Sequence, residues 1–164
     1  NDTNWSDLDY LVIDLPPGTG DTQLTLAQKV PVSGAVIVTT PQDIALLDAR
    51  KGLKMFQKVE VPVLGIVENM SIHICSNCGH EEHIFGEGGG KSMAEQEGVQ
   101  LLGALPLDIH IRQEADSGKP TVVAQPESRI SEIYREIARK TAAKLSLQAK
   151  DYAAKFPRIV IQNN

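Results

Sequence analysis

The chain has 164 residues, of which 41% are hydrophobic and 23% are charged, and its formal net charge is −5. This length and composition are typical of one globular domain with a buried core, to which we assign residues 1–150, with residues 151–164 as a C-terminal tail. The negative charge and the lack of a Lys/Arg run argue against nucleic acid as a partner.

No apolar stretch of the sequence reaches the roughly 20 residues that span a bilayer, so we expect no membrane partner. The two cysteines are too few for a disulfide framework, and no secretory signal opens the sequence, so we expect a cytoplasmic protein. The chain starts at Asn1, and its polar lead continues directly into an apolar run. We therefore expect a piece of a longer chain whose earlier secondary structure is missing.

Apolar runs alternate with amphipathic stretches along the chain, which is typical of β-α units. We expect strands at residues 10–14, 34–40, 63–67 and 101–105, the first of them buried on both faces. We expect helices from residue 22, from Asp43 as N-cap, and at residues 91–97, 108–116 and 127–149. The alternation predicts an α/β fold with a mostly parallel sheet and helices on both faces. Ligands of such sheets bind beyond the carboxyl ends of the strands.

The first expected strand ends in the run IDLPPGTGD, residues 13–21. An acid at this place, Asp14, can hold a water bound to Mg²⁺, since this cation prefers carboxylate and water oxygens. The glycines that follow, Gly18 among them, let a backbone amide approach a terminal phosphate closely. A tight turn in which Asp14 is a local hydrogen-bond acceptor explains the run equally well.

Cys75 and Cys78 lie two residues apart in a polar stretch, residues 70–90, that is too long for an ordinary connection. This spacing lets both sulfurs face one metal ion or cluster, and it favours metal binding over thiol redox chemistry. A Cys₄ site needs twice as many thiolates as this chain has. Either a histidine completes a zinc site, from among His73, His80 and His83, or two chains pool their cysteines in a two-fold dimer. Soft thiolates suit iron–sulfur and zinc alike.

Two further strand ends carry polar residues. Asn69 follows the third expected strand, and its side-chain amide can read both a donor and an acceptor on the edge of adenine. Pro106 and Asp108 follow the fourth and could flank the same base. By contrast, the glycine-rich run at residues 86–92, which ends in Gly-Lys-Ser, lacks the spacing of a phosphate-binding loop, and we interpret it as a connection into a helix.

Taken together, these motifs resemble the bacterial Mrp/ApbC family over roughly residues 8 to 145. The runs that carry the resemblance are, in order, IDLPPGTGD, VTTPQDIALLDARKG, GIVENMS, CSNCG, FGEGGG, LLGALPLD and DSGKP. The family belongs to the MinD-like P-loop ATPases, which work as homodimers with nucleotide near the interface. The resemblance implies that the chain is the C-terminal part of such a domain.

The resemblance also implies roles for single residues. Asp14 would assist Mg²⁺ binding during catalysis, and the turn that contains Gly18 would sense the terminal phosphate of ATP. Asn69 would contact the adenine, with Pro106 and Asp108 near the base. Cys75 and Cys78 would bind a [4Fe–4S] cluster between two protomers. The implied function is a carrier that delivers clusters to apo iron–sulfur proteins and is an ATPase.

Members of this family carry a Gly-rich Walker A loop with two lysines, which has no counterpart in residues 1–164. We therefore expect this chain alone to hydrolyse ATP weakly or not at all. Three alternatives stay open from the sequence. The first is a zinc-binding interaction module, the second is a MinD/ParA-like positioning ATPase, and the third is a degenerate fragment without activity.

Overall fold

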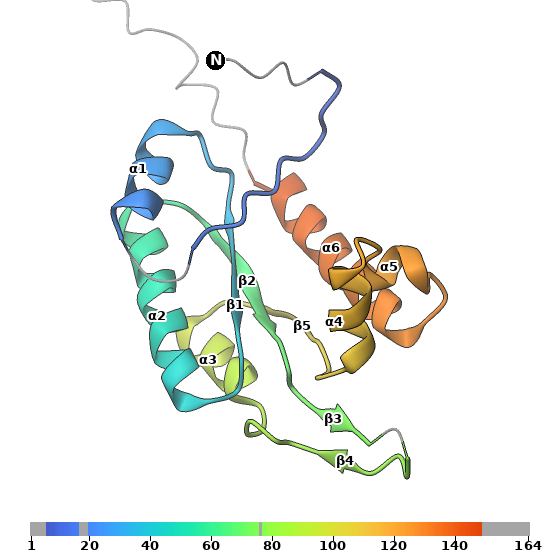
Figure 1. The fold of residues 1–164 in the computed structure, drawn as a ribbon. Helices are drawn as coiled ribbons and strands as arrows, with labels where there is room; N and C mark the ends of the chain where they lie inside the picture. The colour runs from blue at the N-terminus through green and yellow to red at the C-terminus, as the bar shows by residue number, and fades with distance from the viewer. Residues whose placement is uncertain (1–5, 17–19, 76, 149–164) are drawn as a thin grey trace, which may run out of the picture.

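The computed structural model describes residues 6–16, 20–75 and 77–148. A parallel sheet forms its centre, with the strand order β1 (Ala35–Thr39), β2 (Val63–Glu68), β5 (Leu101–Ala104) (Figure 1). The helices of this part of the chain are α1 (Asp21–Lys29), α2 (Asp43–Lys58), α3 (Gly89–Glu97), α4 (Ile109–Asp116), α5 (Thr121–Ala124) and α6 (Arg129–Ser146). A small antiparallel hairpin of β3 (His73–Ile74) and β4 (Glu81–Glu82) extends from the sheet.

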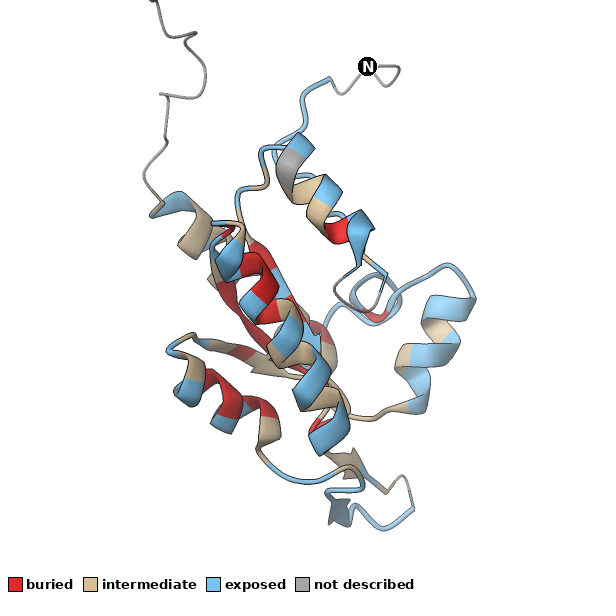
Figure 2. Cartoon of the chain, turned by 90° about the vertical axis from the view of Figure 1, so that its left-hand side faces the viewer, coloured by how far each residue is buried: buried red, intermediate tan, exposed pale blue. Residues whose placement is uncertain are grey.

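Helices cover both faces of the sheet, as the sequence predicts. On one face, Ile37 of β1 and Ile66 of β2 pack with Leu53 and Phe56 of α2 and with Met93 of α3. On the other face, the residues that pack against α6 are Val67, Leu102 and Leu105. Figure 2 shows the buried residues concentrated along the strands and on the inner sides of helices. Every residue of β2 from Leu64 to Glu68 is buried, because this central strand has a covered face on each side.

The expected strand at residues 10–14 is wrong. In the described part of the chain this segment pairs with no strand, and Tyr10, Leu11 and Val12 are 59%, 53% and 90% exposed. It crosses β1 instead of running beside it (Figure 1). An apolar run becomes a strand only where a neighbouring backbone can pair with it. In this part of the chain, Leu15, just beyond the run, is the residue that packs against the core.

Two smaller expectations also change. Gln42, not Asp43, is the N-cap of α2, and Asp43 is the first helical residue. The Gln42 side-chain oxygen accepts a hydrogen bond from the Thr40 hydroxyl, so it does not cap the helix itself. The short helix α5 was not expected, because four residues are too few to show a helical period. No helix of the described residues is long and apolar enough to cross a membrane.

Candidate functional site

The carboxyl ends of β1, β2 and β5 lie at one edge of the sheet, and Asn69 lies there directly after β2. Its backbone amide donates to the Thr39 carbonyl at 2.7 Å, which joins the ends of β1 and β2. Its side-chain oxygen accepts from the Met70 amide at 3.0 Å. Among the described residues the Asn69 side chain makes no other hydrogen bond, so its NH₂ group and the second lone pair of its oxygen are compatible with the predicted reading of a base edge.

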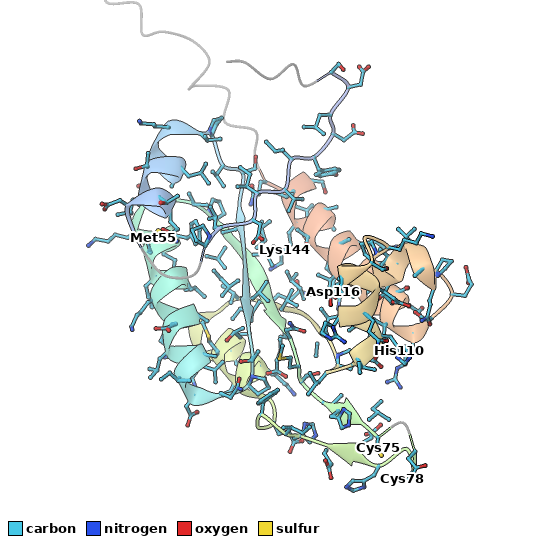
Figure 3. The ribbon with its side chains drawn as sticks, viewed as in Figure 1. Met55, Cys75, Cys78, His110, Asp116 and Lys144 are labelled. Carbon is cyan, nitrogen blue, oxygen red and sulfur yellow. The ribbon has the colours of Figure 1, made fainter. Side chains whose placement is uncertain are left out.

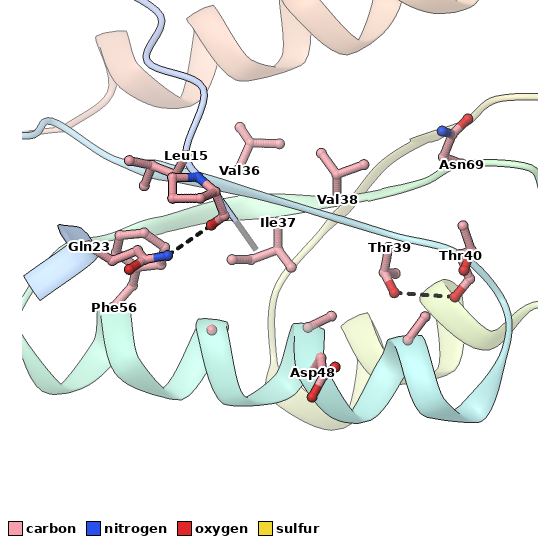
Figure 4. Close-up of a pocket in the computed structure, with 14 residues that line it drawn as sticks. Leu15, Gln23, Val36, Ile37, Val38, Thr39, Thr40, Asp48, Phe56 and Asn69 are labelled. Atoms are coloured by element: carbon pink, nitrogen blue, oxygen red, sulfur yellow. Dashed lines mark hydrogen bonds between the residues drawn. The ribbon is translucent and has the colours of Figure 1, made fainter. Parts of the chain in front are cut away.

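Asn69 also lines a hollow of about 400 Å³ beside β1. Figure 4 shows Leu15 and Gln23 at one end of this hollow, Thr40 and Asn69 at the other, and Val36 and Val38 between them. Gln23 is 3% exposed and donates from Nε2 to the Pro16 carbonyl at 2.8 Å, which holds the start of α1 against the segment that crosses β1. The structure thus brings the region just after Asp14 and the predicted base-reading residue to one surface.

The same hollow does not fit a polyphosphate. Its described lining includes the carboxylate of Asp48 and no Lys or Arg, so it supplies no counter-charge for phosphate oxygens. Asp14 is exposed and lies outside this lining, although its neighbours Leu15 and Pro16 belong to it. Gly18 lies outside the described residues. The described lining of this hollow therefore offers no cradle for phosphates, and contact of Asn69 with a base stays a prediction.

Pro106 and Asp108 lie at the same edge of the sheet, after β5. The Leu105 amide donates to the Glu68 carbonyl at 2.8 Å, so the ends of β5 and β2 stay paired. Asp108 caps α4, because its Oδ1 accepts from the His110 amide at 2.7 Å, and the His110 ring nitrogen Nδ1 is 2.9 Å away. Contact of Pro106 and Asp108 with a base stays a prediction.

Glu68 has a role that the sequence analysis did not find. It is 4% exposed, and its carboxylate accepts a hydrogen bond from the Gly90 amide in the first turn of α3. A carboxylate at a helix N-terminus is stabilised by the unpaired amides and by the helix dipole. The glycine-rich run thus holds a carboxylate of the protein itself, which agrees with our rejection of this run as a phosphate-binding loop. The one feature of the sequence that could have indicated this role of Glu68 is its place as an acid at the end of a buried strand.

Cys75 and Cys78 lie at the tip of the β3–β4 hairpin, away from the hollow (Figure 3). The turn between them is held by two hydrogen bonds, from the Cys75 amide to the His80 carbonyl at 2.9 Å and from the Gly79 amide to the Cys75 carbonyl at 2.8 Å. Gly79 has φ +72°, a left-handed conformation that glycine adopts without strain. Both thiols are free, and Cys78 is exposed while Cys75 is partly covered.

The turn also changes the acidity of one thiol. The backbone amides of Cys78 and, to a smaller extent, Asn77 point at the Cys75 sulfur and lower the pKa of this thiol below its ordinary value. Burial and the charge of Glu82 oppose this effect on the Cys75 pKa. The arrangement therefore favours the thiolate, which is the form that binds metal.

The histidines near the cysteines do not complete a site within one chain. Nδ1 of His73 lies 3.2 Å from the Leu107 carbonyl, and Nδ1 of His83 lies 3.0 Å from the Ser71 carbonyl. The His80 ring is exposed, with Nε2 3.7 Å from a Glu82 oxygen. Among the residues that the structure describes, no group of three or more His, Cys, Asp or Glu side chains is placed to hold a metal ion. The zinc site with two cysteines and two histidines has no support in this geometry.

Comparison with known proteins finds relatives that are named for the transfer of iron–sulfur clusters. The model of the ParA family, described as NUBPL iron-transfer P-loop NTPase, matches residues 1–142. The chain is 70% identical over 136 residues to an iron–sulfur cluster carrier protein of Pseudomonas fragi, which covers 83% of this chain and 47% of that protein. It is 51% identical over 142 residues to the mouse iron–sulfur cluster transfer protein NUBPL, covering 87% of this chain and 44% of that protein.

Solved structures agree with the α/β fold. A nucleotide-binding protein from Archaeoglobus fulgidus in complex with ADP matches with a TM-score of 0.65 at 40% identity, over 77% of this chain and 51% of that chain. The septum site-determining protein MinD from Pyrococcus horikoshii, complexed with Mg-ADP, matches with a TM-score of 0.55 at 24% identity, over 72% of this chain and 44% of that chain, and supports the fold alone. The chain spans less than half the length of the two curated relatives described above.

Proposed function

Because the chain belongs to the NUBPL iron-transfer family of P-loop NTPases, we propose that its protein carries an iron–sulfur cluster as cargo on Cys75 and Cys78. The cargo is a [4Fe–4S] cluster held between two protomers, and the acceptors are apo iron–sulfur proteins. The intact protein binds and hydrolyses ATP with Mg²⁺ in the cytoplasm.

One observation carries the proposal: the two thiols stand together at an exposed hairpin tip, and no third ligand lies beside them among the described residues. A [4Fe–4S] cluster takes a thiolate at each iron, so one chain supplies half of the ligands. In a two-fold dimer the same patch faces itself, and two hairpin tips then complete the set without any further residue.

The exposed position also suits release. A thiolate of an acceptor protein has to reach the iron before a cysteine of the carrier leaves, and a buried cluster would prevent this approach. Cys78 is exposed, and the apolar side chain of Ile74, directly before Cys75, is 43% exposed. The tip therefore has accessible sulfur and an accessible apolar border where another protein can pack.

The nucleotide part of the proposal uses the sheet edge. Asn69 contacts the base, Pro106 and Asp108 lie near it, Asp14 holds a Mg²⁺-bound water, and the turn with Gly18 senses the terminal phosphate. The free donor and acceptor of Asn69 support its role. The lack of a cation among the described lining residues means that the phosphates need Lys or Arg from elsewhere in the protein. We therefore expect residues 1–164 alone to hydrolyse ATP very weakly, and fast Mg²⁺-dependent hydrolysis by them would contradict this.

The cargo assignment is tested by anaerobic reconstitution of the whole protein with iron and sulfide. The parent should turn brown and bind about two iron atoms and two sulfides per chain, since two chains share one cluster. Cys75→Ala and Cys78→Ala should each lose most of this content. Asn77→Ala is the matched control, because it changes the same turn but keeps the backbone amide that points at Cys75.

Equal cluster content in the parent and both cysteine variants would rule out this site. The shared arrangement has its own test, which is sedimentation of the apo and the loaded protein. The loaded parent should sediment as a dimer. A loaded monomer, or one zinc ion per chain without visible absorbance, would contradict a cluster shared by two chains.

A further inference from the structure

The chain between the sheet and the cysteine hairpin continues the pairing of β2 with β5. The Ser71 amide and hydroxyl both donate to the Leu105 carbonyl, at 2.9 and 3.0 Å. The Leu107 amide donates to the Ile72 carbonyl at 2.8 Å, and His73 forms an isolated parallel bridge with Leu107. Residues 71–73 and 105–107 thus form a hydrogen-bonded connector, which leads from the sheet to the hairpin.

Two histidine rings tie the hairpin to this connector. His73 lies in β3, and its Nδ1 is 3.2 Å from the Leu107 carbonyl. His83 follows β4, and its Nδ1 is 3.0 Å from the Ser71 carbonyl. A carbonyl oxygen only accepts hydrogen bonds, so each Nδ1 carries the hydrogen and donates it. Each strand of the hairpin is therefore fixed by one ring to a backbone oxygen of the connector.

His80 lies in the same hairpin and lacks this contact. Its side chain is 67% exposed, and its Nε2 lies 3.7 Å from a carboxylate oxygen of Glu82. The three histidines of the hairpin region are thus of two kinds. Two of them bridge to the connector through Nδ1, and the third lies in the turn beside the cysteines and faces solvent.

We infer that His73 and His83 are positioning residues, which hold the cysteine hairpin at a fixed angle to the sheet through their Nδ1–H groups and do not bind the cluster. This inference rests on the proposed function, because the angle matters only if two hairpin tips must meet over one cargo. Cys75 follows His73 by two residues, and Cys78 lies in the same turn of the hairpin. A rotation of the hairpin about its base therefore moves both sulfurs. Loss of these hydrogen bonds would keep the two sulfurs of one chain together in their turn. It would misalign them with the two sulfurs of the second chain.

Asparagine separates positioning from metal binding. The Asn side-chain NH₂ can donate from nearly the place of Nδ1, whereas Asn has no atom at the place of Nε2. The experiment uses the whole protein with the variants His73→Ala, His73→Asn, His83→Ala and His83→Asn, and with His80→Ala as the matched control. One readout is hydrogen–deuterium exchange of the hairpin amides in the apo protein. The other is the rate at which a ferrous-iron chelator bleaches the reconstituted cluster under anaerobic conditions.

We expect both Ala variants at positions 73 and 83 to exchange the hairpin amides and lose the cluster about threefold to tenfold faster than the parent, the range for loss of one neutral hydrogen bond. The Asn variants and His80→Ala should stay close to the parent. Circular dichroism verifies that each variant is folded. If an Ala variant does not fold, the Asn variants still test the inference.

Three outcomes would overturn the inference. Asn variants that lose the cluster as fast as the Ala variants, with normal exchange, would make Nε2 a ligand. Ala variants that behave like the parent would remove the positioning role, and so would an equal effect of His80→Ala. Exchange in the apo protein does not depend on a cluster, so failure of the cargo assignment is distinguishable from failure of the positioning role.

Discussion

The parallel sheet and the cysteine hairpin differ in how their side chains are covered. Ile66 of β2 and Leu102 of β5 are 0% exposed and lie in two apolar clusters on opposite faces of the sheet. In the hairpin, Cys78 is exposed and Ile74 is 43% exposed. The hairpin is attached to the sheet by hydrogen bonds, whereas the sheet is held by apolar contacts with α2, α3 and α6.

This difference indicates that the sheet determines the stability of the protein, whereas the hairpin carries its reactive side chains. Burial of apolar surface is the dominant favourable contribution to folding, so substitutions in the sheet are expected to destabilise the protein. The two cysteines at the hairpin tip contribute little to this burial, so substitutions there are expected to leave the fold intact. Four predictions test the separation, ordered by the size of the expected effect.

The largest effect is expected for Ile66→Ala. This side chain is fully buried between β1, β2 and the helices, and its truncation leaves a cavity. We expect the free energy of unfolding to fall by about 2–5 kcal/mol, and that of the exposed Cys78→Ala to change by less than about 0.5 kcal/mol. Urea unfolding followed by circular dichroism measures both. Similar losses in the two variants would mean that the hairpin is part of the stability core.

Gly90→Ala probes the junction between the sheet and the segment that follows the hairpin. A Cβ at position 90 would lie 2.9 Å from Oε2 and 3.0 Å from Cβ of the buried Glu68. We expect a loss of about 1–3 kcal/mol in the free energy of unfolding, because Glu68 is buried and the new methyl group would displace the carboxylate that accepts from the amide of residue 90. Gly52→Ala in α2 is the control, since its Cβ would meet nothing within 4 Å. It should stabilise the protein by about 0.5–1 kcal/mol through helix propensity, and a loss there would contradict the packing described.

A smaller effect is expected at the contact between α2 and α3. The Glu97 side chain is 5% exposed and pairs with Lys54 Nζ at 2.5 Å and with Arg50 at 3.5 Å. Both cations are partly exposed, so Glu97→Gln leaves no buried charge, and we expect a loss of about 1 kcal/mol in the free energy of unfolding. Lys51→Met removes an exposed pair with Asp48 and should have no measurable effect. Equal losses in Glu97→Gln and Lys51→Met would show that the burial of Glu97 does not strengthen its ion pairs.

The smallest effect concerns the Cys75 thiol in the apo protein. Its pKa is lowered in the folded state, chiefly by the Cys78 backbone amide, so below the ordinary thiol pKa more thiolate is present when the protein is folded. In a Cys78→Ser variant, which keeps that amide, iodoacetamide should alkylate Cys75 faster in folded than in urea-denatured protein at pH 7. The difference should vanish above the ordinary thiol pKa. A slower reaction of the folded protein at pH 7 would contradict the lowered pKa.

The strands of the sheet could be predicted because a strand that is buried on both faces has an uninterrupted apolar sequence. This holds for β2, whereas in β5 only Leu102 is fully buried. Their polar neighbours Asn69 and Asp108 lie at the expected edge of the sheet. The segment at residues 10–14 has the same kind of run and is exposed. Composition records a tendency to be buried, but only the tertiary structure decides whether a backbone partner stands beside the run.

The cysteine pair could be recognised from spacing, but the support around it could not. The contacts of His73 with Leu107 and of His83 with Ser71 join segments that are 34 and 12 residues apart. Glu68 and Gly90 are 22 residues apart. No local pattern predicts such pairs, because they depend on how the loops after β2 and β5 fold together.

Leu102 has a consequence for the outer flank of the sheet. The β2–β5 register passes from Leu101 opposite Ile66 to Gly103 opposite Val67, so Leu102 is an extra residue, and Lys140 donates to its carbonyl at 3.1 Å. A short outer strand with a bulge and a lysine is a poor template for a foreign strand. Within the described part of the chain, edge-to-edge pairing of two copies along β5 is therefore disfavoured.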